Sequence, residues 1–329
     1  MTKHEVLALL RQQTSPLSGQ AIAEALGISR TAVWKAVGAL QREGYRIDSV
    51  PRRGYVLVQA TQVLSAVEIQ NHLGDHPWAD SITVVDSVDS TNNLAKQLAG
   101  AGAPEGTCVL AERQTGGRGR LGRSFASPGG MGVYLSVIIR PDAKPDALMH
   151  LSACVAQAGA EAVEAQTGLH AGIKWVNDLV AGGKKLSGIL TELSVELESG
   201  RVQYAVIGIG VNCCQRPSDF PPEIADVATS IAIQTGADPD RNALAAALIR
   251  ALHRLSGELL TQRAAWMDRY RERCVTLGKQ VRVLLPDGAR EAVVLGLNDY
   301  AALEVEYADG TRATVSSGEV SVRGMYGYI

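Results

Sequence analysis

The stretch Thr107-Cys-Val-Leu-Ala-Glu-Arg-Gln-Thr-Gly-Gly-Arg-Gly-Arg-Leu-Gly-Arg123 joins an apolar strand pattern, at 107–112, to a loop rich in glycine and arginine. The loop's three arginines, Arg118, Arg120 and Arg123, follow one another at spacings of two and three. Glycine lets the backbone approach a ligand closely, and guanidinium groups bind phosphate or carboxylate through paired hydrogen bonds. The P-loop pattern GxxxxGK[ST] is absent, so we predict that these arginines, instead of a P-loop lysine, bind an anion or a nucleotide. A solvated surface loop or an RNA-contacting Gly/Arg tract is the alternative, although the preceding strand disfavours a disordered tract.

A second stretch, Gly172-Ile-Lys-Trp-Val-Asn-Asp178 followed by Gly183-Lys-Lys-Leu-Ser-Gly-Ile-Leu-Thr-Glu192, predicts one β-hairpin. Lysines beside a carboxylate suit a site where negative charge develops, as in phosphoryl or acyl transfer. A surface hairpin with an Asn-Asp turn explains the pattern equally well. This hairpin is expected to bring together Lys174, Asn177, Asp178 and Lys185.

A third stretch, the apolar strand Ile207-Gly-Ile-Gly-Val-Asn212, leaves room for a ring or a ribose at its Gly-x-Gly. This pattern is a weak signal alone.

The central part of the chain alternates strand and helix patterns. Asp89-Ser-Thr-Asn92 follows the first strand, and Ser90 is placed to cap the next helix. Strands interrupted by helices predict an α+β or α/β domain. The expected strands lie at 82–85, 107–112, 133–140, 173–176, 186–193 and 204–209, and the longer helices at 148–166 and 242–273.

Residues 1–60 have the pattern of a winged helix-turn-helix, with the helix-turn-helix at about 19–38. Gly27 can adopt the left-handed conformation that ends one helix, and Ser29 can cap the next, which reads the DNA groove in such motifs. An alternating stretch at 45–58, with Pro51-Arg-Arg-Gly54 at its tip, predicts the wing. A small helical protein-interaction module is the alternative. The expected DNA contacts are Arg30, Thr31, Trp34, Lys35, Arg52 and Arg53.

The C-terminal part, at 278–329, has the pattern of a small β-barrel. Short strand patterns occur at 281–285, 292–297, 303–307, 312–316 and 320–323. The stretches Pro286-Asp-Gly288 and Ala308-Asp-Gly310 are turn signals between them.

Charge and cysteine content narrow the class of protein. The 329 residues carry a net charge of −2, but residues 1–60 hold eight Lys or Arg against four Asp or Glu, and the rest hold 24 against 30. A basic head on an acidic body suggests that only the head meets a polyanion. Five cysteines fit neither a disulfide framework nor a CxxC metal knuckle. With no signal peptide or membrane-length apolar run, we expect a cytoplasmic protein that does not enter the membrane.

Together these motifs resemble the bacterial bifunctional biotin protein ligase that also serves as biotin operon repressor. Asp89-Ser-Thr-Asn92, the Gly-Arg-Gly-Arg-x-Gly-Arg loop at 117–123, Lys174-Trp-x-Asn-Asp178, Lys185-Leu-x-Gly188 and Gly210-x-Asn212 occur in the family's order and approximate spacing. The resemblance covers essentially the whole chain. It implies an α+β protein with a winged helix-turn-helix at 1–60, a class II synthetase-like mixed α/β catalytic domain at 65–273, and an SH3-like β-barrel at 278–329. Val176 stands where the family commonly has proline, and the loss of proline puts the rigidity of that turn in doubt.

Roles for individual residues follow from the resemblance, motif by motif. Short polar side chains would bind the neutral ureido head of biotin, and cations would bind its carboxyl end and the phosphates. Asp178 would orient the incoming lysine or accept its proton. The expected catalytic residues are Arg118, Lys185, Asp178 and Lys174. The expected biotin-binding residues are Ser90, Thr91, Asn92, Gln114, Arg118, Gly119, Arg120 and Lys185. The expected nucleotide-binding residues are Arg118, Arg120, Arg123, Asn177 and Asn212, and no protein-bound metal is expected.

The implied reaction uses Mg-ATP to activate biotin as biotinoyl-AMP and then transfers biotin to a lysine of a biotin carboxyl carrier protein. Operator DNA and a homodimer formed when the adenylate is bound are the further implied partners. A lipoate–protein ligase and a non-catalytic DNA-binding ligand sensor remain alternatives at this stage. A third possibility keeps the ligase and leaves the winged helix without a function.

Overall fold

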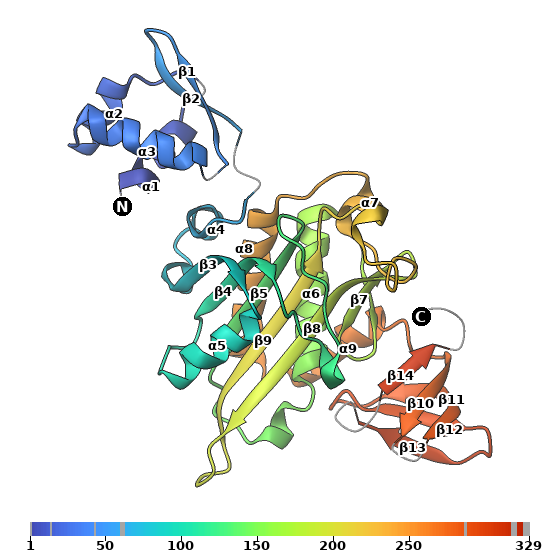
Figure 1. The fold of residues 1–329 in the computed structure, drawn as a ribbon. Coiled ribbons are helices and arrows are strands. Elements are labelled where there is room, and N and C mark those ends of the chain that lie inside the picture. The colour runs from blue at the N-terminus through green and yellow to red at the C-terminus, as the bar shows by residue number, and fades with distance from the viewer. Residues whose placement is uncertain are drawn as a thin grey trace. The chain divides into compact units, whose positions relative to one another are not determined.

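A computed structural model describes residues 2–13, 15–42, 44–59, 63–285, 288–316 and 321–324. The chain divides into two compact units, Met1–Glu68 and Ile69–Ile329 (Figure 1), which we describe separately. None of the helices in the described ranges combines the length and the apolar character that crossing a bilayer requires.

The first unit is a winged helix-turn-helix, as predicted. Helices α1 (Thr2–Arg11), α2 (Gly19–Leu26) and α3 (Arg30–Arg42) precede strands β1 (Arg46–Val50) and β2 (Gly54–Gln59), which pair antiparallel as the wing. Gly27 ends α2 with a φ of 62°, and the Ser29 hydroxyl accepts a hydrogen bond from Ala32 N at 3.1 Å. The signal that ends α2 and the signal that starts α3 therefore both act as the sequence indicates.

The core of this unit extends beyond the wing into α4 (Ala66–Leu73), the helix that begins in the first unit and ends in the second. Val67 packs against the helical core, and Glu68 is only 2% exposed. The Glu68 carboxylate accepts a hydrogen bond from the Tyr45 hydroxyl and forms an ion pair with Arg11. The first compact unit thus runs through Glu68.

The second unit is built on a seven-stranded mixed sheet in which only β3 and β4 pair in parallel. Helix α5 (Thr91–Gly100) packs on one face through Ala95 and Ala99, next to Val109, Ile138 and Val206. Because strand residues alternate between faces, Gly208 and Gly210 of β9 face this side. The order is β3 (Ile82–Val88), β4 (Cys108–Gln114), β5 (Gly132–Ile139), β9 (Val202–Asn212), β8 (Lys184–Val195), β7 (Asp178–Ala181) and β6 (Gly172–Lys174).

The opposite face of the sheet is covered by α6 (Leu151–Thr167), which in turn packs against α8 (Arg241–Glu258) and α9 (Arg263–Arg273), while α8 also contacts β5 (Figure 1). Gly159 of α6 comes so close to Ile209 that an added Cβ would lie 2.8 Å from its side chain. A short helix, α7 (Ile231–Thr235), precedes α8. The predicted breaks within 242–273 are confirmed by the end of α8 and the start of α9.

The prediction of one hairpin around the Asn-Asp pair is wrong. Strand β7 lies between β6 and β8, so the region forms two successive hairpins. The second turn contains Gly182 and Gly183, whose φ angles of 53° and 74° suit glycine. Four residues, Asp178–Ala181, are enough for a strand here because both neighbours pair with it.

The C-terminal part forms the expected small β-domain. Its strands pair antiparallel around a core that includes Val281, Val283, Val294 and Leu303. The predicted turn at 286–288 has its first two residues outside the described ranges, as does residue 320 of the last expected strand. The sheet order is β13 (Arg312–Val315), β12 (Leu303–Tyr307), β11 (Gly288–Leu297), β10 (Gln280–Leu285) and β14 (Ser321–Gly324).

Candidate functional site

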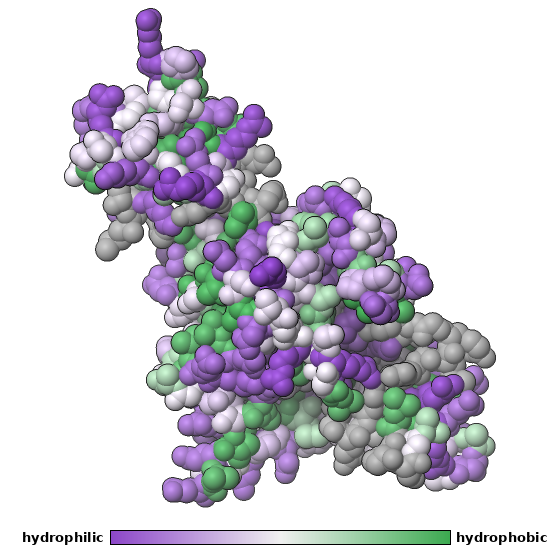
Figure 2. Space-filling model, viewed as in Figure 1, coloured by the Kyte–Doolittle hydropathy of each residue, from purple (hydrophilic) through white to green (hydrophobic). Residues whose placement is uncertain are grey.

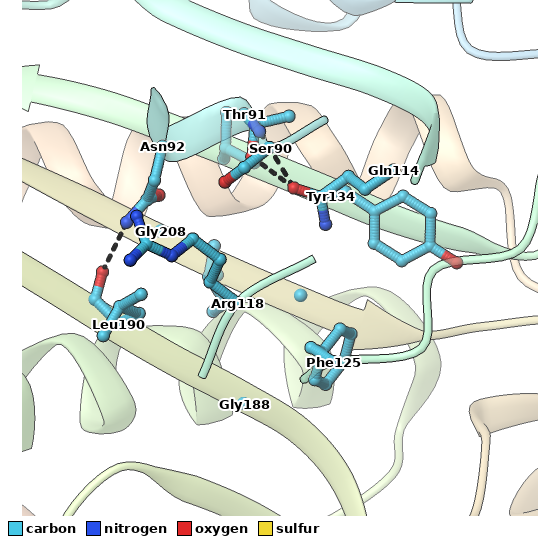
Figure 3. A pocket seen from close by; sticks show the side chains of 13 residues that line it. Ser90, Thr91, Asn92, Gln114, Arg118, Phe125, Tyr134, Gly188, Leu190 and Gly208 are labelled. Carbon is cyan, nitrogen blue, oxygen red and sulfur yellow. Dashed lines mark hydrogen bonds between the residues drawn. The ribbon is translucent and has the colours of Figure 1, made fainter. Parts of the chain in front are cut away.

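A partly open cavity lies on the α5 face of the central sheet, bounded by the start of α5, the end of β4 and the arginine-rich loop. In the view of Figure 3, Ser90 and Thr91 lie on one side and Phe125 on the other, with Arg118 extended between them. The remaining wall comes from β5, β8 and β9. The lining residues are Ser90, Thr91, Asn92, Gln114, Arg118, Phe125, Tyr134, Leu135, Gly188, Leu190, Gly208, Ile209 and Gly210.

One side of the cavity is lined by uncharged polar groups, namely Ser90, Thr91, Asn92 and Gln114, and the buried Ser136 supports them from behind. We call these five residues the neutral side. The Gln114 side-chain oxygen accepts hydrogen bonds from Thr91 N at 2.9 Å and Thr91 Oγ1 at 3.1 Å. Its amide nitrogen donates to Ser127 Oγ at 2.8 Å. These contacts fix the orientation of Gln114 before any ligand arrives.

Asn92 is held by a second set of contacts on the neutral side. Its Nδ2 donates to Leu190 O at 3.2 Å and to Glu192 Oε2 at 2.8 Å. Its Oδ1 lies 2.6 Å from the buried Ser136 hydroxyl, which is also 2.8 Å from Thr91 Oγ1. Since both amide protons already have acceptors, Asn92 holds the cavity wall in place and offers no free donor to a ligand.

Glu192 stabilises this arrangement from outside the cavity. Burial alone would raise the pKa of Glu192, but hydrogen bonds from Lys96 and Asn92 outweigh it and hold the pKa below its usual value. The Lys96 ammonium lies 2.8 Å from Glu192 Oε1. The carboxylate therefore stays ionised and keeps the Asn92 amide oriented.

Ser90 differs from its neighbours. It occupies the N-cap position of α5, as predicted, but its side chain makes no capping hydrogen bond, which corrects the expectation for its hydroxyl. The residue is 2% exposed and lines the cavity. Within the described part of the chain its hydroxyl makes no hydrogen bond, so this group is available to a ligand.

Glycines of two strands make room for the floor of the cavity. A Cβ at Gly208 would lie 2.1 Å from Asn92 Oδ1, and a Cβ at Gly210 would lie 2.5 Å from the Phe125 ring. The Phe125 ring also borders Gly188 and lies edge-on to Tyr134, with 6.4 Å between ring centroids. The space expected for a ligand ring over Gly210 is thus occupied by Phe125, which forms an apolar wall.

Positive charges gather at and beside the cavity, and we call this group the cationic side; it consists of Arg118, which lines the cavity, and of Arg120 and Lys185, which lie next to it. Arg118 is exposed and its Nη1 donates to Asn93 Oδ1 at 3.1 Å. Burial lowers the pKa of Arg120, while the nearby Asp178 charge raises it. Arg120 Nη1 lies 3.4 Å from Asn177 Oδ1, so the loop reaches the β6–β7 turn.

Lys185 completes the cationic side from β8. Its ammonium lies 2.7 Å from Asp178 Oδ1 and 6.0 Å from the centre of the Phe125 ring. Asn177 Nδ2 donates to Ile189 O at 2.6 Å, which fixes the turn that carries Asp178. The side chain of Lys185 is 30% exposed, so an anion can reach it.

The β6–β7 turn is also supported by the C-terminal domain. Trp175 N donates to Thr276 Oγ1 at 2.9 Å, and Trp175 Nε1 donates to Ala301 O at 2.8 Å. The peptide bond between Trp175 and Val176 is cis. Trp175 itself is 5% exposed and acts as a buried anchor.

The structure brings together most of the predicted site. Of the predicted residues, Ser90, Thr91, Asn92, Gln114 and Arg118 line the cavity, and Arg120, Asn177, Asp178 and Lys185 form a contact group beside it. Lys174 pairs with Asp178 in the sheet register, one strand farther from the cavity. Gly119 and Arg123 form the turn of the loop, where Gly119 N donates to Arg123 O at 2.7 Å.

Asn212 lies apart from the lining residues. It is 5% exposed, its Nδ2 donates to Thr229 O at 2.9 Å, and its Oδ1 accepts from Gln215 Nε2 at 3.2 Å. These contacts fix the segment that follows β9. A direct contact of Asn212 with a nucleotide stays a prediction.

Sequence reasoning missed four residues of the site: Ser136, Phe125, Tyr134 and Glu192. Ser136 gives a signal in retrospect, because it is the one serine in the otherwise apolar and aromatic stretch 132–139. Phe125 and Tyr134 carry none, since an aromatic residue near a loop or in a strand is ordinary core composition.

A second candidate site lies on the first unit, in a groove between α3 and the wing. Arg30, Thr31, Trp34 and Arg52 line it, as expected for DNA contacts, whereas Lys35 and Arg53 are exposed but not part of the lining. The structure adds further lining residues: Ser18, Gly19, Gln20, Ser49, Val50, Gly54 and Tyr55.

No group of three or more His, Cys, Asp or Glu side chains that could hold a metal ion occurs in the ranges that the structure describes. The five cysteines are unpaired. Burial raises the pKa of the Cys108 thiol and of the Cys154 thiol, to about 12 in each case. These two thiols are therefore protonated at neutral pH and unsuited to nucleophilic chemistry.

Comparison with known proteins assigns all three parts of the chain. The family model "HTH domain" matches residues 2–56, "Biotin/lipoate A/B protein ligase family" matches 84–212, and "Biotin protein ligase C terminal domain" matches 276–323. Bifunctional ligase/repressor BirA of Bacillus spizizenii is 35% identical over 321 residues, covering 96% of this chain and 97% of the relative. The protein of the same name from Escherichia coli is 32% identical, covering 93% and 92%.

Solved structures agree with this assignment for about three quarters of the chain. Biotin protein ligase from Aquifex aeolicus in complex with biotin and ATP superimposes with a TM-score of 0.63 at 29% identity. The match covers 74% of this chain and 99% of that one.

Proposed function

The chain belongs to the family of bifunctional biotin ligase/repressors, and from this premise we propose that it joins biotin to a lysine of a biotin carboxyl carrier protein through biotinoyl-5′-AMP. The observation that carries the proposal is one cavity that has a neutral wall and, at and beside it, the cations Arg118, Arg120 and Lys185. Biotin has the matching division, with an uncharged ureido ring system at one end and a carboxylate at the other.

The neutral side is the proposed site of the ureido head. The free hydroxyl of Ser90 donates to or accepts from the ureido group, while Thr91 and Gln114 shape the wall beside it. The apolar ring of Phe125 lies against the less polar part of the bicycle. Because these groups are fixed by one another, the head binds without a large ordering cost.

The cationic side is the proposed site of the first chemical step. A carboxylate oxygen of biotin attacks the α-phosphorus of ATP, the bond to the bridging oxygen of the β-phosphate breaks, and pyrophosphate leaves. Arg118, Arg120 and Lys185 stabilise the negative charge that the carboxylate and the phosphate bring together. Arg123, Asn177 and Asn212 are proposed to contact the nucleotide, with Gly119 allowing the backbone to approach it.

In the second step the amine of the carrier lysine attacks the carbonyl of the mixed anhydride, and AMP leaves with the bonding electrons. Asp178 is proposed to orient the amine and to accept the proton that it loses, with Lys174 adding positive charge nearby. No protein nucleophile is needed, because the anhydride is already an activated acyl group. Catalysis then rests on positioning and charge stabilisation.

Magnesium is proposed to enter with ATP. The donors at this site are mainly cationic and amide side chains, and the described residues hold no cluster of carboxylates for a metal. The chemistry fits an ion that is held mostly by the phosphates, whose charge it would reduce.

The first unit is proposed to bind operator DNA through α3 and the wing, with biotinoyl-AMP as the corepressor. An adenylate that orders the arginine-rich loop would favour a homodimer, which presents two winged helices to a two-part operator. The protein is proposed to act in the cytoplasm, where its carrier protein and DNA are found.

The test of the ligase proposal is a transfer assay with the full chain, ATP, labelled biotin and a biotin carboxyl carrier domain. We expect label on the carrier lysine, and none when the lysine is replaced by arginine or ATP is omitted. An excess of unlabelled lipoate should leave the labelling unchanged. Competition by lipoate would favour the lipoate–ligase alternative, and binding of biotin without labelling would favour the non-catalytic sensor.

A further inference from the structure

Resting on the proposed DNA-binding function, we propose that Trp34 is a specificity-determining residue that reads thymine in the major groove through the base's 5-methyl group. The proposal concerns what the groove of the first unit recognises, and three observations support it: the exposure of the indole, its place on α3, and the charges around it.

The first observation is exposure. Trp34 is 66% exposed, more than any other large hydrophobic side chain in the described part of the first unit. Large apolar residues of this unit such as Leu7, Ile22 and Leu40 are almost completely buried. Leaving an indole in water forgoes the stabilisation that burial brings, so its position suggests a surface that is covered in a complex.

The second observation is the position of Trp34 on α3. Val33, Ala36, Val37 and Leu40 are buried against the rest of the unit. The opposite face of α3 is exposed and carries Arg30, Thr31, Trp34 and Lys35. Because the N-terminal part of a recognition helix contacts base edges, Trp34 at the second turn is placed to reach them.

The third observation is the charge of the groove. Its lining contains two arginines, Arg30 from α3 and Arg52 from the wing, and no carboxylate. Hydrophilic side chains cover most of the face of this unit seen in Figure 2. An apolar indole that shares a groove with two cations therefore fits a polyanion that carries a small apolar group better than it fits an apolar protein partner.

The chemistry of the major groove identifies that group. Among the four base pairs, only the thymine methyl presents an apolar surface in this groove, next to the acceptor oxygen O4. An indole offers an apolar ring and one N–H donor, and no acceptor. Trp34 thus matches thymine and has nothing to accept the amino group of cytosine or adenine.

The experiment uses the full chain with biotin and ATP present. Bound duplexes are first selected from a random DNA pool, and each thymine of the selected duplex is then replaced by uracil, which removes the methyl alone. We expect at least one position where uracil weakens binding about fourfold, the effect of one methyl group. In Trp34→Ala the thymine and uracil duplexes should bind equally.

Arg52→Ala provides the comparison variant. It should weaken binding to every duplex and leave the fourfold methyl effect at the same position, because a phosphate contact carries no base preference. The inference is overturned if the selected duplex shows no methyl-sensitive position, or if Trp34→Ala keeps the same sensitivity with an unchanged thermal midpoint. If no duplex is enriched at all, the DNA-binding proposal itself fails, which is a different result.

Discussion

The neutral and cationic sides of the cavity are built in opposite ways. On the neutral side Thr91, Asn92 and Gln114 are locked by hydrogen bonds to one another and to the sheet, and Asn92 has no donor left over. On the cationic side Arg118 lies on an exposed loop, and Lys185 is 30% exposed beside a single carboxylate.

The difference separates recognition from chemistry. A pre-ordered set of uncharged groups can select a ligand by shape and hydrogen bonding at little entropic cost. Exposed cations contribute little to stability, yet they can move onto a charge that appears only during the reaction. We therefore expect substitutions on the cationic side to lower the rate of adenylation, and substitutions on the neutral side to weaken biotin binding.

Lys185→Ala should have the largest effect. Removing a cation from the carboxylate–phosphate junction is expected to lower biotin-dependent ATP–pyrophosphate exchange roughly 100- to 1,000-fold. The thermal midpoint should change little, because a partly exposed ion pair such as Lys185–Asp178 contributes at most about 1 kcal/mol. The neighbouring Lys184→Ala is the matched control and should keep the wild-type rate. Equal rates for the two variants would contradict the role of Lys185.

Arg118→Ala should be next. One charge-assisted hydrogen bond to the adenylate is worth roughly a 10- to 100-fold change in its retention. The variant should either fail to form the adenylate or release it into solution, while the fold survives because Arg118 is exposed. Quantifying free biotinoyl-AMP by chromatography measures this, with Arg113→Ala as an exposed-arginine control from the same strand–loop junction. Full retention of the adenylate by Arg118→Ala would show that the loop does not hold it.

Ser136→Ala tests the neutral side. It removes the hydroxyl that contacts both Asn92 and Thr91, so we expect the KM for biotin to rise about 10-fold, a cost of roughly 1.4 kcal/mol, with the KM for ATP unchanged. Ser152→Ala is the control, because Ser152 forms a comparable hydrogen bond with Thr191 on the opposite face of the sheet. If both variants raised the KM for biotin equally, Ser136 would act through general stability alone.

The smallest effect concerns pH. The pKa of Glu192 in the folded protein lies below its usual 4.5, so its stabilising contribution is complete above that value and is lost as the pH falls toward the folded pKa. At pH 7 we expect Glu192→Gln to melt roughly 1–4 °C below the wild type. The gap should close in acid below the usual pKa. A gap that stays constant down to low pH would mean that the ionised carboxylate contributes nothing.

Much of the fold could be predicted because local signals agree with the tertiary structure. Gly27 ends α2 by its backbone conformation and Ser29 caps the start of α3, and both effects depend on neighbouring residues alone. The short strand at 178–181 could not be predicted in the same way. It is stable because β6 and β8 pair with it on both sides, and four residues carry too weak a pattern to reveal that pairing.

The sequence predicted the charged residues of the candidate site better than it predicted the hydrogen bonds among the uncharged ones. Arg118, Arg120 and Lys185 stand in motifs whose composition points to anion binding. By contrast, Asn92 also stands in a motif, but its amide group donates hydrogen bonds to Leu190 and Glu192, about 100 residues away in the chain. Such contacts depend on which strands become neighbours, so the spacing of residues in the sequence does not disclose them.

The most direct measurement is biotin-dependent exchange of labelled pyrophosphate into ATP by the purified chain, without a carrier protein. Exchange requires the cationic side to stabilise the joined carboxylate and phosphate, and it requires nothing from the DNA-binding unit. We predict exchange that depends on biotin, that lipoate cannot replace, and that Lys185→Ala nearly abolishes. Absence of exchange in wild-type protein that binds both biotin and ATP would contradict the account.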